Sequence, residues 1–249
     1  MQRKTSERDL VTNADFAAEQ LIVERLRRAR PDDAIVAEEG GVVAGTSGLV
    51  WGVDPLDGTT NFVSGIPHWA TAVGCEDATG SLVGVVFDPV RDELFAAARG
   101  RGATVNGLAA AASRCRILER AVVAFGPAWE DRWREHRAAV SERVPAAVAH
   151  VRQMGSLALD LAWTAAGRFD AFYYEAGLHP WDLAMRVVAE EAGLRTVVLE
   201  ERVDRPGALV AAPPALYEAL VRATGRDRSS SDSARGAGAG PDADAVGGR

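Results

Sequence analysis

The stretch VDPLDGTTNF, residues 53–62, places two aspartates at the end of an apolar segment. The apolar run at 49–53 predicts a buried strand that delivers Asp54, and Pro55 then forces a turn that brings Asp57 close to Asp54. Two carboxylates this close repel each other unless a cation lies between them, and oxygen ligands with no His or Cys nearby favour Mg²⁺ or Mn²⁺. The alternative interpretation is an Asp-Pro turn in which Asp57 caps a helix.

The residues that follow, Gly58, Thr59 and Thr60, can open a helix, whose first backbone amides bind anions such as phosphate. The chain carries 28 Lys and Arg residues against 35 Asp and Glu residues, a net charge of −7. This balance argues against a nucleic-acid scaffold, and it means that an anionic substrate needs a local source of positive charge. A bound cation together with a helix N-terminus would supply that charge.

Two further acidic segments occupy comparable positions. Glu38 and Glu39 follow an apolar strand predicted at 34–37, and Asp182 stands at the start of an apolar helix predicted at 181–192. Taken singly, each acid is more often a surface group or a helix cap than a metal ligand. Taken together with Asp54 and Asp57, they favour the metal interpretation.

The composition narrows the class of protein. Cys75 and Cys115 are the only cysteines, which argues against a disulfide scaffold or a zinc ribbon and favours a reducing compartment. No apolar run approaches the ~18 residues of a membrane-spanning helix, and the first residues lack the apolar core of a signal peptide. We therefore expect a cytoplasmic protein with neither a membrane nor a nucleic acid as its partner.

The hydrophobic pattern differs between the two halves of the chain. Thr12 and Asp15 fit a capping box for an amphipathic helix that ends at Pro31. Predicted strands of the first half lie at 34–37, 49–53, 69–75, 82–87 and 93–97, with a hairpin-like segment at 100–107. The second half alternates strands at 121–125, 148–153, 169–174, 196–199 and 208–212 with helices at 130–143, 156–166, 181–192 and 214–223. This alternation predicts sheets covered by helices, and the small and polar residues at 225–249 predict a disordered tail.

The chain resembles the inositol monophosphatase family in three blocks: DLVTNAD (9–15) with AEEG (37–40), DPLDGTTNF (54–62) and HPWDLAMRVVAEEAG (179–193). The resemblance runs from about residue 4 to residue 222, and the DPLDGTTNF block is highly specific. It implies a layered αβαβα sandwich of the α+β and α/β classes. An α+β half with a large antiparallel sheet would span 1–118, an α/β half would span 119–224, and the site would lie in the cleft between them.

The resemblance further implies a magnesium-dependent, lithium-sensitive sugar phosphatase that binds two or three Mg²⁺ ions, with Mn²⁺ as an alternative. The implied metal ligands are Glu38, Asp54, Asp57, Asp182 and the Leu56 carbonyl. Glu38 and Thr59 would position and activate the attacking water, with Asp15 beside Thr59 in an outer layer. The implied substrate contacts are Asp57, Gly58, Thr59, Thr60, Ser156, Leu157, Glu175 and Asp182.

Some residues keep a second interpretation. Lys4, the only lysine, matches a family loop over the metals, or it is a solvated terminal residue. Glu175 would accept hydrogen bonds from ring hydroxyls, or it is an ordinary surface acid. His68 is expected to be structural, and His179 either structural or an orienting neighbour of Asp182.

The implied reaction is hydrolysis of inositol monophosphate or a similar phosphorylated polyol, by a homodimer. The alternatives are the same chemistry on fructose 1,6-bisphosphate, histidinol phosphate or 3′-phosphoadenosine 5′-phosphate, and a regulatory or interaction role on a phosphatase fold. Family members usually carry an N-terminal helix before the segment that matches Lys4. Without that helix, we expect apolar sheet surface to be exposed.

Overall fold

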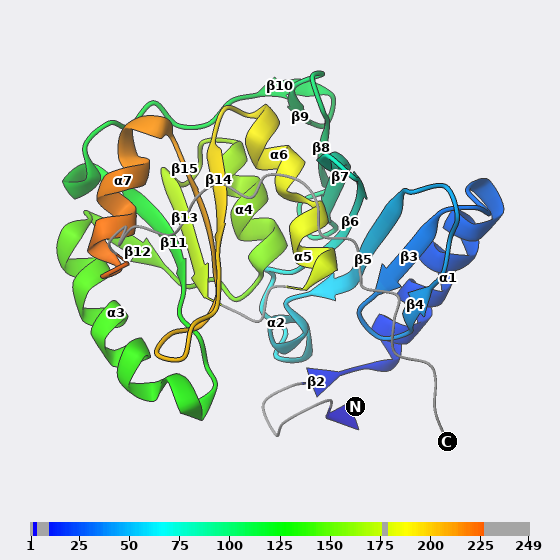
Figure 1. Cartoon of the computed structure of the whole chain (residues 1–249), viewed down its shortest axis with the longest axis horizontal. Helices are drawn as coiled ribbons and strands as arrows, with labels where there is room; N and C mark the ends of the chain where they lie inside the picture. Colours follow the sequence, from blue (N-terminus) through cyan, green and yellow to red (C-terminus); the bar gives the residue numbers. More distant parts are fainter. Residues whose placement is uncertain (1, 4–9, 176–178, 227–249) are drawn as a thin grey trace, which may run out of the picture.

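The computed structural model describes residues 2–3, 10–175 and 179–226, and its first large sheet is built around the strand that carries the DPLD motif (Figure 1). This sheet has eight strands in the order β10-β9-β8-β7-β6-β5-β3-β4. Its strands β3 and β5 are parallel and its other neighbours are antiparallel. Their bounds are β3 Ala34–Ala37, β4 Gly41–Val43, β5 Val50–Asp57, β6 Ala70–Asp77, β7 Gly80–Asp88, β8 Glu93–Ala98, β9 Ala103–Val105 and β10 Leu108–Ala110. A separate two-stranded pair joins β1 (Gln2–Arg3) to β2 (Leu10–Val11).

The second sheet has five strands in the order β12-β11-β13-β15-β14. Strand β11 runs parallel to β12 and β13, whereas β15 runs antiparallel to β13 and β14. Their bounds are β11 Val122–Gly126, β12 His150–Arg152, β13 Ala171–Glu175, β14 Arg195–Leu199 and β15 Ala208–Ala212. Both sheets are therefore mixed.

Helices separate and cover the two sheets, as Figure 1 shows. Between the sheets lie α4 (Leu157–Ala165), α5 (Pro180–Ala184) and α6 (Arg186–Glu191), and side chains of α4 and α6 share one apolar cluster with residues of both sheets. Helix α1 (Asn13–Ala29) covers the outer face of the first sheet, and α3 (Arg134–Ala147) and α7 (Pro214–Ala223) cover the outer face of the second. The short elements are α2 Thr59–Val63, η1 Leu118–Arg120 and η2 Asp131–Trp133. The predicted αβαβα sandwich is confirmed.

The capping box predicted at Thr12 begins α1. The Thr12 side chain accepts a hydrogen bond from the Ala14 amide, and the Asp15 carboxylate accepts one from the Thr12 amide at 2.9 Å. The periodic pattern predicts an apolar face of five residues, Ala18, Leu21, Ile22, Leu26 and Ala29. Ile22 and Leu26 pack against a small cluster that includes Val53 of β5, whereas Leu21 is exposed. The helix thus lies directly behind the strand that carries the motif.

The structure corrects several predicted element boundaries. The single helix predicted at 181–192 is two helices, α5 and α6, with Met185 as a turn residue between them. Helix α3 begins at Arg134 rather than at residue 130, because η2 occupies the preceding turn. Strand β4 was not predicted. The disordered tail predicted at 225–249 begins too early, because Arg226 is buried and contacts Glu175, and residues 227–249 lie outside the described residues.

The outer face of the first sheet is apolar beyond α1. Strands β7 and β8 pair Phe87 with Leu94, and the side chains of Val85, Phe87 and Leu94 are 36%, 36% and 42% exposed. Their neighbours Val86 and Phe95 point to the opposite face and are buried. This part of the sheet therefore presents apolar side chains to the surface. No helix in the described ranges is both long enough and apolar enough to cross a bilayer.

Candidate active site at the end of β5

Strand β5 runs on through Asp54, Leu56 and Asp57, so the turn predicted at Pro55 is wrong and an irregularity within the strand takes its place. The pairing of β5 with β6 shifts register between Asp54 and Asp57, so the strand is irregular where the motif begins. Asp54 is 5% exposed, and its carboxylate accepts a hydrogen bond from the Leu56 amide at 3.0 Å. The Pro55 carbonyl accepts a hydrogen bond from the Thr71 hydroxyl at 2.9 Å. Thr71 of β6 thus holds the backbone at Pro55, while the Asp54 side chain stays buried.

Asp57 is bound to the N-terminus of α4. Its carboxylate accepts hydrogen bonds from the Leu157 amide at 3.1 Å, from the Ala158 amide at 2.7 Å and from the Ser156 hydroxyl. A carboxylate is favourable at this position because the first amides of a helix have no partner within the helix. The two predicted halves of the chain are therefore joined through a predicted metal ligand.

Gly58 makes the sharp step from β5 into α2. Its φ is +93°, and a Cβ atom there would lie 3.2 Å from both the Gly155 carbonyl oxygen and the Ser156 Cβ. A residue with a side chain would be strained and crowded at once. The amides predicted to bind phosphate, those of Gly58, Thr59 and Thr60, lie at the start of α2, which has five residues.

Thr59 links the motif to α1. Its hydroxyl lies 3.2 Å from a carboxylate oxygen of Asp15 and 3.1 Å from the Leu56 carbonyl oxygen, so its single proton serves one acceptor at a time. Asp15 is fully buried. The contact between Asp15 and Thr59 that the resemblance implies is present.

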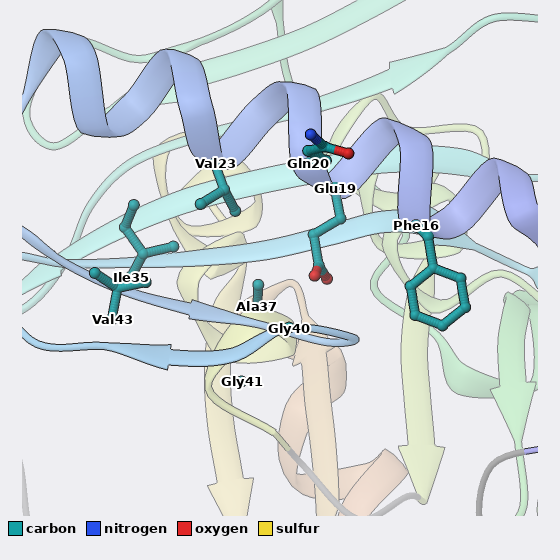
Figure 2. A pocket seen from close by; sticks show the side chains of 9 residues that line it. All are labelled: Phe16, Glu19, Gln20, Val23, Ile35, Ala37, Gly40, Gly41 and Val43. Atoms are coloured by element: carbon teal, nitrogen blue, oxygen red, sulfur yellow. The ribbon is translucent and has the colours of Figure 1, made fainter.

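Glu38 follows β3 directly, and its amide donates to the Val53 carbonyl at 3.1 Å. The adjacent Glu39 amide donates to the carboxylate of Glu19 on α1 at 2.7 Å. Glu19 lies in an apolar pocket of about 290 Å³ between α1 and the β3–β4 hairpin (Figure 2). This helix-to-hairpin contact fixes the backbone on which Glu38 is carried.

Asp182 comes from α5, in the layer between the sheets. It is 8% exposed, and its carboxylate accepts a hydrogen bond from the His179 amide at 3.1 Å. The His179 ring stacks on Trp181 with a centroid distance of 4.5 Å. Asp182 therefore caps the start of its own helix, as the alternative interpretation of that residue required.

The pKa shifts of Asp54 and Asp182 indicate that these acids lie near one another. Burial raises the pKa of Asp54 well above its ordinary value, and the charges of Glu38, Asp57 and Asp182 raise it further. Burial raises the pKa of Asp182 to about 8, against the lowering effect of the His179 amide, and Asp57 and Glu38 add to the rise. Burial likewise raises the pKa of Asp57 to about 6, although its donors on α4 work against the shift. Glu38, Asp57 and Asp182 therefore lie close enough to Asp54 to raise the pKa of its carboxyl group.

As they stand, these acids do not form a finished coordination sphere. Among the described residues, no group of three or more His, Cys, Asp or Glu side chains is placed so that it could hold a metal ion. Asp54, Asp57 and Asp182 each accept a hydrogen bond from a protein donor. The tight convergence predicted from the sequence is thus met in electrostatic contact but not in coordination geometry. The donor chemistry nevertheless fits Mg²⁺ or Mn²⁺, because buried carboxylate oxygens with raised pKa values are stabilised by a hard cation.

Glu175 lies in a different environment from the one the resemblance implies. It is 1% exposed, and its carboxylate is contacted by His136 at 2.6 Å, by Arg226 at 3.2 Å, by the Ala128 amide at 3.3 Å and by the Tyr173 hydroxyl. It is not the ordinary surface acid of the alternative interpretation. A hydrogen bond from Glu175 to a substrate hydroxyl remains a prediction, and it would have to displace one of these donors.

The other predicted contacts are only partly tested. Ser156 is the N-cap of α4, and Leu157 is buried in the central apolar cluster. Lys4 lies outside the described residues. Sequence reasoning missed Asn61, whose side-chain amide donates to the carbonyls of His68 and Met154, both at 2.7 Å.

Sequence reasoning also missed Asp160, which is fully buried and paired with His68. The signal was available, because Asp160 is the one acidic residue in the otherwise largely apolar segment LALDLAWTA of α4.

Comparisons with known proteins agree with the fold and the motifs. A sequence model described as the inositol monophosphatase family matches residues 1–228. A protein named Nus factor SuhB from Pasteurella multocida is 41% identical over 191 residues, covering 76% of this chain and 71% of that protein. The Escherichia coli K12 protein of the same name is 42% identical over 188 residues, covering 74% of this chain and 70% of that protein.

Solved structures show the same likeness. The crystal structure of SuhB from Bartonella henselae has a TM-score of 0.82 at 35% identity, covering 88% of this chain and 86% of that one. An inositol monophosphatase from Anabaena has a TM-score of 0.77 at 34% identity, covering 86% of each chain.

Proposed function

The chain belongs to the inositol monophosphatase family, and we propose that it is a Mg²⁺-dependent phosphatase that hydrolyses inositol monophosphate or a similar phosphorylated polyol. The observation that carries the proposal is the mutual electrostatic contact of Asp54 with Glu38, Asp57 and Asp182 at the end of β5. Asp54 and Asp182 are buried and Glu38 and Asp57 are partly exposed, and a protein does not ordinarily place other acids around a buried carboxylate without a compensating cation. A homodimer in the cytoplasm remains a prediction.

Different residues would bind the metal ions and orient the phosphoryl group. Glu38, Asp54, Asp57, Asp182 and the Leu56 carbonyl would hold the metal ions. Bound Mg²⁺ would stabilise the phosphoryl oxygens and lower the pKa of the attacking water. The amides of Gly58, Thr59 and Thr60 would orient the phosphoryl group, because the first amides of a helix are free to donate. No covalent intermediate on the protein is required.

Thr59 and Asp15 would move and hold a proton. Thr59 lies within hydrogen-bond distance of Asp15, whose carboxylate is also held by the Thr12 amide. Asp15 therefore orients the Thr59 hydroxyl, and that hydroxyl with Glu38 would fix the direction from which water approaches the phosphorus atom. Such positioning and charge stabilisation account for most of the catalysis in phosphoryl transfer.

A substrate panel tests the proposal. Purified protein with Mg²⁺ is expected to release phosphate from inositol 1-phosphate and to be inhibited by Li⁺. The same panel includes fructose 1,6-bisphosphate, histidinol phosphate and 3′-phosphoadenosine 5′-phosphate, so the preferred substrate separates the alternatives. Folded protein that releases no phosphate from any of them would contradict the proposal.

A second candidate function is favoured by the names of the curated relatives, which are called Nus factors. In that case the fold would serve as an interaction surface in a regulatory or RNA-machinery-associated role. The substrate panel discriminates here too, because a purely regulatory protein would be silent on it while still binding its partner. Retention of the buried acids weighs towards the enzyme.

A further inference from the structure

His68 and Asp160 form a buried hydrogen-bonded pair near the candidate site. The His68 Nε2 lies 2.9 Å from a carboxylate oxygen of Asp160, and the two residues are 2% and 0% exposed. His68 lies between α2 and β6 of the first sheet, and Asp160 lies in the first turn of α4. The Trp163 ring meets the imidazole edge-on at 5.0 Å and restricts its rotation.

The pair is one part of a junction between residues 57–68 and 154–160. Asp57 binds the first amides of α4, Asn61 donates to the Met154 carbonyl, and His68 binds Asp160. The two backbones also approach closely, since a Cβ on Gly155 would lie 3.1 Å from the Asn61 amide nitrogen. The position of the α4 N-terminus relative to the motif is therefore set by side chains on both sides of the junction.

His68 is the only side chain whose hydrogen bond lowers the pKa of Asp160 among the described residues, and burial raises that pKa. The second oxygen of Asp160 and the Nδ1 of His68 are both buried without a hydrogen-bond partner among the residues that the structure describes. Removal of the imidazole would leave an uncompensated carboxylate within one turn of the amides that hold Asp57. Loss of one partner of a buried pair is far more disruptive than loss of both.

We propose that His68 and Asp160 are positioning residues for Asp57: the hydrogen bond between them fixes the start of α4, and α4 in turn orients the Asp57 carboxylate towards the other acids. The inference rests on the proposed function in one respect, that Asp57 is a metal ligand. Neither residue contacts the reacting groups directly. Groups that orient a metal ligand from outside affect metal affinity by about 10- to 100-fold.

The test measures Mn²⁺ binding by electron paramagnetic resonance, in the absence of any substrate. We expect His68→Phe to weaken Mn²⁺ binding roughly tenfold, the lower end of the range for outer groups. Asp160→Asn keeps an acceptor for His68 and is expected to stay within about twofold of the wild type. The Mg²⁺ concentration for half-maximal phosphate release should follow the same order.

Arg30→Met is the matched control. It deprives Asp33, which is 3% exposed, of its guanidinium partner at 2.7 Å, but at the far end of β3. It is expected to lower the melting temperature without changing Mn²⁺ affinity. An equal loss of Mn²⁺ affinity in Arg30→Met would overturn the inference, because the effect would then be general destabilisation.

A double variant covers the case in which His68→Phe does not fold. His68→Phe with Asp160→Asn removes the buried charge but also removes the tie, so it should fold and still bind Mn²⁺ about tenfold more weakly. Wild-type affinity in either folded variant would overturn the inference. Wild-type protein that binds Mn²⁺ but releases no phosphate would refute the proposed function alone, and wild-type protein that binds no Mn²⁺ would overturn the inference together with its premise.

Discussion

Two strands of this protein end in buried acids, and the surroundings of those acids are opposite. At the end of β13, Glu175 is compensated by Arg226 and His136. At the end of β5, the charges nearest Asp54 are those of other carboxylates, and they raise its pKa. Burial costs both acids their hydration, but at β13 the protein supplies the positive charge itself. The comparison indicates that β5 is where an external cation is required.

The largest effect is expected from Asp54→Asn. Removing this carboxylate should reduce Mg²⁺-dependent phosphate release by at least about 1000-fold, since a metal ion contributes several kcal/mol to such a reaction. The substitution should not destabilise metal-free protein, because one buried like charge is gone. Phosphate release and thermal melting in EDTA measure the two effects.

Asp88→Asn is the control for Asp54→Asn. Asp88 is also buried, but Arg91 compensates it at 2.9 Å. Its replacement should leave phosphate release within a few-fold of the wild type. An equal loss of phosphate release in Asp54→Asn and Asp88→Asn would contradict the assignment of Asp54 as a metal ligand.

The second largest effect is expected when Arg226, the partner of Glu175 at the end of β13, is removed. Arg226→Met should lower the free energy of unfolding by about 3 kcal/mol, because Glu175 then keeps a buried charge with fewer partners. Urea denaturation measures this value. Adding Glu175→Gln to Arg226→Met should recover part of the loss, and a double variant less stable than Arg226→Met would show that the ion pair is not what matters.

A smaller effect is expected from pH. The pKa values of Asp57 and Asp182 are raised to about 6 and about 8, so the native protein holds protons that the unfolded chain releases above about pH 4. Stability of metal-free protein should therefore fall as pH rises from 5 to 8, by about 5 °C in melting temperature. A flat or rising profile in EDTA would contradict the assigned shifts. Adding Mg²⁺ at pH 8 should restore the loss.

The smallest effect is expected where the charges are exposed. Arg132 and Glu201 form an ion pair at 3.1 Å, with side chains 60% and 48% exposed. Arg132→Ala should not shift the urea midpoint measurably, because water solvates either charge alone. A loss comparable to that of Arg226→Met would mean that pairing rather than burial dominates.

Most of the fold could be predicted from local patterns. The capping box at Thr12 predicted the start of α1, and apolar runs separated by turn residues predicted most strands of the two large sheets. The break at Met185 could not be predicted, because neither a proline nor a glycine marks it in the segment WDLAMRVV. It follows from packing between the two sheets, where Met185 is buried.

Some residues of the candidate site could likewise be identified from the sequence, and others could not. The motif residues were identified from sequence because DPLDGTTNF combines a strand end, a proline and a glycine step within ten residues. The pairing of His68 with Asp160 and of Glu175 with Arg226 was not, since these partners are 92 and 51 residues apart. No local pattern encodes a contact over that distance.

By itself, the sequence determined that the chain carries acidic residues at the ends of apolar segments, with a glycine where the backbone must turn sharply. Only the tertiary structure decided which of those acids lack compensation, because a carboxylate's ionisation depends on burial and on the charges that surround it in space. Asp54 and Glu175 both follow apolar residues in the sequence, and they differ because Arg226 and His136 reach only one of them.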